Sequence, residues 1–241
     1  MGEPFISQSS GATEVHSASN YLSNFILGCQ DGLVNVLGIL LGLTAATSDV
    51  KLIFVGALAA LGAESISMGA VAYTSTLARR KQYLKEVNRE NSEIKEVPHL
   101  ERKEVRDVFQ RWGYEGEELE NVTNLIASRP KAWVEFMMSH ELRLQPVDAS
   151  EPGRSFLVVL SSAVVGSIIP LVPYFLVGKD LLQGAVGSVM VSGVALFIIG
   201  FYEARMTVGS LWKSGLQMVA IGLAAGLAGF LIGHFVGASP A

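Results

Sequence analysis

The chain has little cysteine, few aromatic residues and almost no charge over most of its length. Its 241 residues include one cysteine, Cys29, so no disulfide can form within the chain. Aromatic residues make up 8% of the sequence, and the formal net charge is −4. A negatively charged chain without a basic patch interleaved with aromatics does not have the pattern of a nucleic-acid-binding protein. We therefore expect no nucleic acid partner.

Lysine and arginine are absent from the first 20 residues, which are polar and rich in serine. These residues lack the positively charged segment that opens a secretory signal peptide. We expect residues 1–20 to form a disordered N-terminal tail.

Charge is concentrated in one segment. Residues 82–153 hold 15 of the 22 acidic and 10 of the 18 basic residues, although half of the whole chain is hydrophobic. Outside this segment, five apolar stretches have the roughly 20 residues that a membrane-spanning helix needs. These stretches are Tyr21–Thr47, Lys51–Ala78, Ser155–Val177, Leu182–Tyr202 and Leu211–Val236. The sequence predicts an all-α, multi-pass integral membrane protein with four parts: the tail 1–20, transmembrane helices 1 and 2 in 21–81, a helical insert in 82–153, and transmembrane helices 3 to 5 in 154–241.

Basic residues near the ends of the spans predict the orientation, because they are enriched on the cytosolic side. One side of the predicted bundle carries Arg79, Arg80, Lys81, Lys85, Arg154, Arg205 and Lys213. The opposite side carries only Lys51 and Lys179. We therefore expect the N-terminus and the insert 82–153 to be cytosolic, and Asn121 in its Asn-Val-Thr sequon to stay unglycosylated.

Small residues recur in the spans at a spacing that lets helices pack closely. The motifs are Gly38-x-x-x-Gly42, Gly222-x-x-x-Gly226 and Gly229-x-x-x-Gly233. They are compatible both with packing inside one chain and with a subunit interface.

Two carboxylates fall inside the first two spans, where an ionisable side chain is costly and marks a candidate functional site. If a short turn near residue 49 joins these spans, Asp31 is nearly level with Met68, and Glu64 lies one helical turn away. Asn35 shares a helix face with Asp31, as Glu64 does with Met68. Carboxylates with a thioether favour late first-row ions over Mg²⁺ and Ca²⁺. The alternatives are an acid satisfied by packing at Asp31 and a gap-filling Met68.

The insert contains a second candidate metal site. The helix of span 2 has no breaker before Pro98, and three further helices are predicted over Leu100–Trp112, Glu117–Ser128 and Pro130–Leu142. The break at Pro98 allows the two helical segments beside it to pool their carboxylates. The candidate ligands are Glu90, Glu93, Glu101, Glu104, Met137, Met138 and Glu141. The spacing alone also fits a solvated acidic face with the two methionines buried as core.

With these motifs, the chain resembles the vacuolar iron transporter family. The resemblance covers nearly the whole chain from Tyr21 and includes Asp31-Gly-Leu33, Ile66-Ser-Met-Gly69, Phe136-Met-Met138 with Glu141-Leu142, and Ile169-Pro-Leu-Val-Pro-Tyr174. It implies a homodimer in the lipid bilayer, with an ion path between the subunits. It also implies that the insert is a metal-binding domain using the seven ligands named above, and that Asp31 and Met68 are intramembrane ligands. In the plant-type pattern, the acid of span 2 falls at the position of Ala60, whereas here the acid is Glu64.

The resemblance implies a proton-coupled antiporter that moves cytosolic Fe²⁺ out of the cytosol. It would hold no permanent cofactor and could also carry Mn²⁺, Co²⁺, Ni²⁺ or Zn²⁺. A eukaryotic member would lie in the vacuolar membrane and a prokaryotic member in the plasma membrane. The alternative is a membrane-anchored divalent-metal sensor or binding protein without transport. We do not expect an enzyme, because a di-iron carboxylate site needs two Glu-x-x-His motifs, and the chain has only Glu96–His99, interrupted by Pro98.

Overall fold

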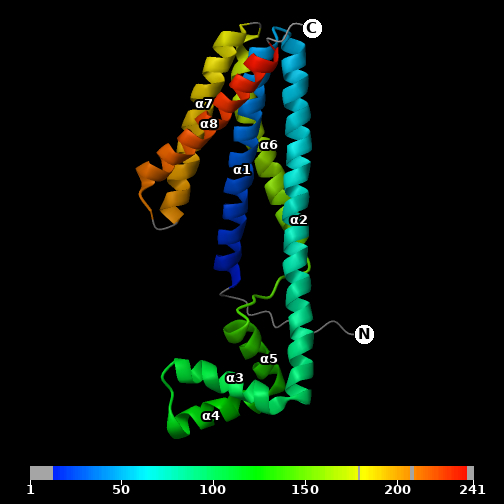
Figure 1. The fold of residues 1–241 in the computed structure, drawn as a ribbon, viewed down its shortest axis with the longest axis vertical. Helices are drawn as coiled ribbons and strands as arrows, with labels where there is room; N and C mark the ends of the chain where they lie inside the picture. Colours follow the sequence, from blue (N-terminus) through cyan, green and yellow to red (C-terminus); the bar gives the residue numbers. More distant parts are fainter. Residues whose placement is uncertain (1–12, 179, 207–208, 238–241) are drawn as a thin grey trace. The chain divides into compact units, whose positions relative to one another are not determined.

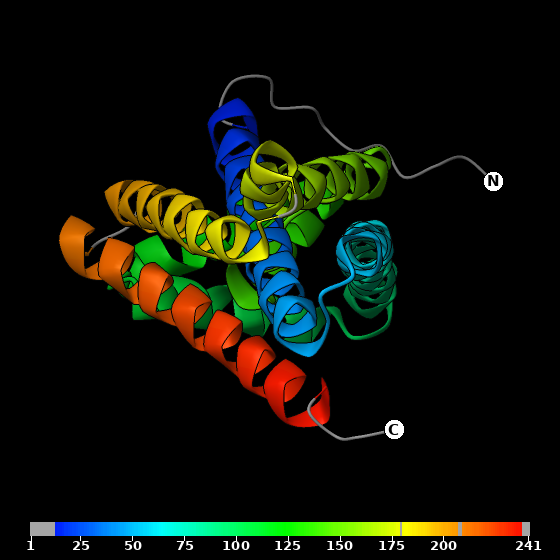
Figure 2. The ribbon, with the colours of Figure 1, turned by 90° about the horizontal axis from the view of Figure 1, so that it is seen from above.

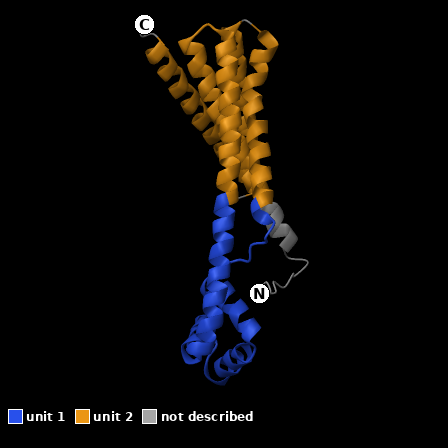
Figure 3. Cartoon of the chain, turned by 90° about the vertical axis from the view of Figure 1, so that its right-hand side faces the viewer, with its two compact units in different colours: residues 1–6, 74–152 blue, residues 7–73, 153–241 orange. Residues whose placement is uncertain are grey.

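The computed structural model describes residues 13–178, 180–206 and 209–237, and their side chains from Tyr21 on. These residues form helices and connecting loops, without a strand. They divide into two compact units (Figure 3): one holds residues 74–152, and the other holds the described residues up to 73 and from 153. Of the predicted tail 1–20, residues 1–12 lie outside the described residues, and the first helix begins at Thr13.

Five helices of the described chain are long and apolar enough to cross a membrane, as predicted. They are α1 (Thr13–Ala46), α2 (Val50–Glu96), α6 (Glu151–Val177), α7 (Leu181–Met206) and α8 (Leu211–Gly237) (Figure 1). α6 begins four residues before the predicted span. The reason is local, because Glu151 and Pro152 both suit the first turn of a helix. We take residues 51–78 as the membrane-spanning part of α2, since the charged sequence begins at Arg79.

The core of the membrane unit joins α1, α2 and α6. Val36 and Leu40 of α1 pack with Ile53 of α2 and with Leu171 and Tyr174 of α6. The Tyr174 hydroxyl lies 2.7 Å from the Thr44 hydroxyl, which satisfies both groups inside the bundle. Many large apolar side chains point outward, and Leu176 is 80% exposed. An apolar exterior around an apolar core is expected when the surrounding solvent is lipid.

Glycines bring α8 against the C-terminal half of α1, and Figure 2 shows the C-terminal parts of the two helices side by side. A Cβ atom on Gly233 would overlap the carbonyl oxygen of Gly42, and one on Gly229 would overlap that of Gly38. Two of the three predicted small-residue motifs therefore pack against each other within one chain. The third, at Gly222 and Gly226, meets leucine side chains of the same chain.

α6 remains helical through both of its prolines. The Ser188 hydroxyl of α7 donates a hydrogen bond of 2.8 Å to the Pro170 carbonyl. A hydroxyl on a neighbouring helix thus satisfies a backbone group near the residues where proline removes a donor.

The second unit contains the C-terminal part of α2 and the helices α3 (Pro98–Arg111), α4 (Gly116–Ala127), α5 (Pro130–Phe136) and η1 (Met137–Glu141). Pro98 and Pro130 open their helices, where their missing N–H groups cost nothing. The core contains Val105, Val108, Phe109, Leu119, Trp133, Phe136 and Met137. The rings of Phe109 and Phe136 stack at 5.1 Å.

The helix predicted over Pro130–Leu142 is present in two parts, because α5 is followed directly by a π-helical turn over residues 137–141. The Leu142 N–H donates to the Met137 carbonyl at 3.0 Å, one residue further back than in an α-helix. The turn is followed by Arg143, whose φ of 53° lies in the left-handed region. Helix propensities do not signal such a widened turn.

Candidate metal centre

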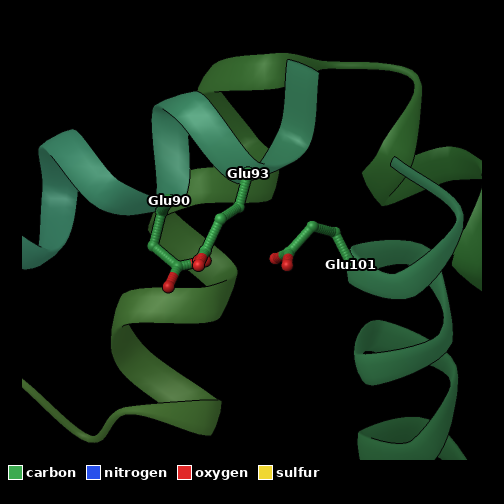
Figure 4. A group of neighbouring side chains, drawn as sticks. All are labelled: Glu90, Glu93 and Glu101. Carbon is green, nitrogen blue, oxygen red and sulfur yellow. The ribbon is translucent and has the colours of Figure 1, made fainter. Parts of the chain in front are cut away.

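Three carboxylates of the second unit converge (Figure 4). Glu90 and Glu93 extend from α2 and Glu101 from α3, and one oxygen of each lies within 4.8 Å of the others. α2 ends at Glu96 and α3 begins at Pro98, so a single residue separates the two helices. The break at Pro98 therefore brings acids from two helices together. Converging carboxylate oxygens are typical ligands of divalent cations.

Two of the three converging carboxylates are buried rather than solvated. Glu90 is 1% exposed and Glu101 is 4% exposed. The Oε2 atom of each is buried and has no hydrogen-bond partner among the described residues. Burying a carboxylate oxygen without a partner costs free energy. The interpretation as a solvated acidic face does not hold for these two residues.

Burial and like charges raise the pKa values of four acids in this region. Burial first, and then Glu104 and Glu90, raise the pKa of Glu101 to about 7. Burial raises the pKa of Glu90, although a hydrogen bond from Arg89 opposes that shift. Burial and neighbouring acids also raise the pKa values of Glu104 and Glu141. Glu104 and Glu141 therefore belong to the same electrostatic cluster, and such perturbed groups concentrate at functional sites.

Arg89 is part of this cluster and was not singled out from the sequence. Its Nη1 lies 2.8 Å from Glu86, its Nη2 3.4 Å from Glu90, and its Nε 3.3 Å from Glu93. The signal was present in the spacing, because Glu86 and Glu93 lie three residues before and four residues after Arg89 on one helix.

The two methionines occupy different surroundings. Both are at most 1% exposed. Met137 is a member of the hydrophobic core, where it packs with residues such as Val105 and Phe136. Met138 lies outside that core cluster, and Glu141, at the end of the π-helical turn, is exposed. The alternative of a methionine buried as core therefore describes Met137.

The membrane unit holds the other candidate residues. The Asn35 amide donates a hydrogen bond to Glu64 Oε1, and the Asp31 carboxyl interacts electrostatically with Glu64. Asn35 lies 14 residues before Asp49, and Glu64 lies 15 residues after it. The proximity of Asp31 to Met68, which the hairpin argument also expects, stays a prediction. Two neighbouring carboxylates at membrane depth leave a negative charge that a proton or cation can neutralise.

Asn35 and Glu64 also line a groove of about 650 Å³ formed by α1, α2 and α8. They are its polar side chains, and the other walls are glycine, alanine, valine, isoleucine and leucine. Ala60, one helical turn from Glu64, lines the same groove. The groove thus exposes an acid and an amide within an otherwise apolar surface.

Five apolar helices, two of them carrying a half-buried acid, together with a helical unit that gathers carboxylates, define a multi-pass membrane protein with clustered acids. A model of the VIT family matches residues 22–234. The chain belongs to the VIT family, and the resemblance predicted from the sequence is confirmed.

Proteins similar to this chain carry the name vacuolar iron transporter. Vacuolar iron transporter 1 of Arabidopsis thaliana is 31% identical over 225 residues, which cover 93% of this chain and 90% of that protein. Vacuolar iron transporter 2 of Oryza sativa subsp. japonica is 34% identical, with 90% and 89% covered. The vacuolar iron transporter of Plasmodium falciparum is 29% identical, with 88% and 81% covered. Membership of this family of transporters confirms the expectation of a transporter rather than an enzyme.

Proposed function

We propose that the protein is a proton-coupled antiporter that moves Fe²⁺ out of the cytosol, into a vacuole or across the plasma membrane. The convergence of Glu90, Glu93 and Glu101 carries this proposal. The choice of iron as the metal rests on the names of the related transporters. Mn²⁺, Co²⁺, Ni²⁺ and Zn²⁺ are further candidate substrates, since the donor set does not select one late first-row ion.

The carboxylate cluster is the proposed entry site. Glu90, Glu93 and Glu101 supply oxygens, and Glu104 and Glu141 add negative charge that attracts a cation. Met138 is the better placed thioether ligand, because Met137 is held in the hydrophobic core. Residues 82–153 and the N-terminus face the cytosol in this proposal, so the cluster collects cytosolic metal.

The second proposed site lies in the membrane and uses Asp31, Asn35, Glu64 and Met68. Metal binding requires deprotonated carboxylates, so a proton and a metal ion compete for the same oxygens. A proton arriving from an acidic compartment would release the metal there, and this competition couples the two fluxes. Glu64 takes the role that the family pattern gives to an acid at Ala60, because both positions line the same groove.

The apolar groove of α1, α2 and α8 supports a homodimer. We propose that a second copy of this chain covers it, so that the Asn35 and Glu64 side chains of both copies line an ion path. Apart from Asn35 and Glu64, the groove is lined by apolar residues, and such a surface suits packing against a helix of a second copy.

Transport into proteoliposomes tests the function. Wild-type protein should accumulate Fe²⁺ under anaerobic conditions, faster when the receiving side is acidic. Asp31→Ala and Glu64→Gln should each reduce accumulation at least tenfold, while Asp180→Asn should not. Asp180 is the matched control, because its carboxylate accepts a hydrogen bond from the Gln183 N–H at the start of α7. Accumulation that is independent of the pH gradient would contradict proton coupling and indicate a uniporter.

A non-transporting metal sensor is the second candidate, because the unit 74–152 has its own core and its own carboxylate cluster. Metal binding without transport in the same proteoliposomes would favour the sensor.

A further inference from the structure

The guanidinium of Arg89 contacts a different carboxylate with each of its three nitrogens. Two of those carboxylates, on Glu90 and Glu93, are proposed metal ligands, and the oxygens engaged are Glu90 Oε1 and Glu93 Oε2. The third partner, Glu86, holds the closest contact at 2.8 Å. A positive side chain is thus already placed beside two of the carboxylates that a metal ion would use.

Arg89 also differs from its partners in exposure. Its side chain is 48% exposed, whereas that of Glu90 is 1% exposed. Arg89 therefore reaches the cluster from the solvent side and can rotate away into water without unfolding the helix. Ion pairs of half-exposed side chains are weak, so little holds the guanidinium in place.

Arginine has only donors and stays charged at any pH that a cell reaches. It therefore neutralises the acids without taking up or releasing a proton, but it cannot share an oxygen lone pair with a metal ion. A bound divalent ion and a guanidinium a few ångströms away also repel each other.

We propose that Arg89 is a displaceable counter-cation that competes with the metal for the carboxylate cluster and sets the affinity of that cluster. This inference rests on the proposed function of the cluster as a metal site. When the metal binds, Arg89 leaves Glu90 and Glu93 for solvent or remains only with Glu86. The competition keeps the entry site weak enough to pass its ion on.

The experiment titrates the full-length protein in detergent with Co²⁺ at pH 7.5, and isothermal titration calorimetry gives the Kd. Removing one positive charge beside a divalent ion in this half-exposed setting should tighten binding by about tenfold in Arg89→Gln. Arg89→Lys keeps the charge and should bind within about threefold of the wild type. The matched control is Arg102→Gln, because Arg102 pairs with Glu120 at 2.8 Å in the same unit but has no ion pair with the cluster. Arg102→Gln should leave the Kd unchanged.

Equal or weaker Co²⁺ binding by folded Arg89→Gln would overturn the proposal and make Arg89 a residue that positions the ligands. Other results would contradict the proposed function of the cluster as a metal site. These results are a wild type that binds no Co²⁺, or a Glu101→Gln variant that binds it as well as the wild type. A measurement on the wild type alone covers the case in which Arg89→Gln does not fold. Phenylglyoxal should modify Arg89 at least threefold faster with Co²⁺ bound, as read by peptide mass spectrometry. An unchanged or slower rate would contradict displacement.

Discussion

Replacing Glu101 by glutamine should stabilise the protein above neutral pH and weaken its metal binding. Glu101 is 4% exposed, and its pKa is raised from the ordinary 4.5 to about 7. Above pH 7 the folded chain must ionise this buried acid, whereas the unfolded chain ionises it freely above pH 4.5. The raised pKa therefore costs stability above pH 7, and the cost disappears as the pH falls from 7 to 4.5.

The difference in pKa corresponds to roughly 3 kcal/mol at pH 8, at about 1.4 kcal/mol for each pKa unit. Glu101→Gln removes this cost, so its stability relative to the wild type should be greatest at pH 8 and small at pH 5. In a unit of this size, 3 kcal/mol would raise the Tm by roughly 12–24 °C. Added metal should stabilise the wild type and leave Glu101→Gln nearly unchanged, because a ligand stabilises only the protein that can bind it.

Hydrogen exchange of the full-length protein in detergent measures this difference locally, in the peptides of α3 and η1. Exchange in these peptides should slow in Glu101→Gln at pH 8, after correction for the intrinsic pH dependence of exchange. Added Co²⁺ should slow it only in the wild type. A matched Glu118→Gln variant controls for the loss of one charge, since Glu118 is an exposed acid in the first turn of α4. The reasoning fails if Glu101→Gln exchanges faster than the wild type at pH 8, or if the two respond equally to Co²⁺.

Three further predictions concern other parts of the molecule. Gly233→Leu should prevent the packing of α8 on α1 and lower the yield of folded protein in size-exclusion chromatography, whereas Gly62→Ala should not, because a Cβ atom there meets nothing within 4 Å. Arg143→Gly should stabilise the second unit by up to about 1 kcal/mol in denaturant unfolding, since glycine adopts a φ of 53° without strain; a lower midpoint would contradict this. Asn35→Leu should remove the hydrogen bond to Glu64 and slow Fe²⁺ transport several-fold in proteoliposomes, and unchanged transport would show that the amide has no role.

The apolar runs predicted the five membrane-crossing helices, because length and hydropathy are almost sufficient to specify a membrane-spanning helix. The break at Pro98 was also predictable, since proline ends one helix and suits the start of the next. Because the chain turns at Pro98, Glu90 and Glu93 before the turn could be expected to lie close to Glu101 after it.

Other features depend on three-dimensional contacts that a single sequence does not reveal. The pairing of Gly38 and Gly42 with Gly229 and Gly233 requires knowledge of which helices touch. The π-helical turn at residues 137–141 has no counterpart in the helix propensities of its residues. Arg89 was treated as one charge in a charged segment, although its spacing from Glu86 and Glu93 already placed all three on one helix face.

The two carboxylate sites differ in the group that compensates their charge, and this difference bears on how each could work. In the second unit, Glu90 and Glu93 have a cationic partner in Arg89. In the membrane unit, the partner of Glu64 is the neutral amide of Asn35, with Asp31 adding a further acid. Arg89 can move between the cluster and water, but a charged side chain inside the membrane has no water to move into.

A neutral amide leaves the charge of the intramembrane acids to be balanced by something that can itself cross the membrane, namely a proton or the metal ion. We therefore expect proton coupling to arise at Asp31 and Glu64 and not at the Arg89 cluster. Arg89→Gln should change the Fe²⁺ concentration that half-saturates transport but leave its dependence on the pH gradient intact. Glu64→Gln should reduce the dependence on the gradient even at saturating Fe²⁺. Loss of the gradient dependence in Arg89→Gln would place the coupling in the cluster and refute this division.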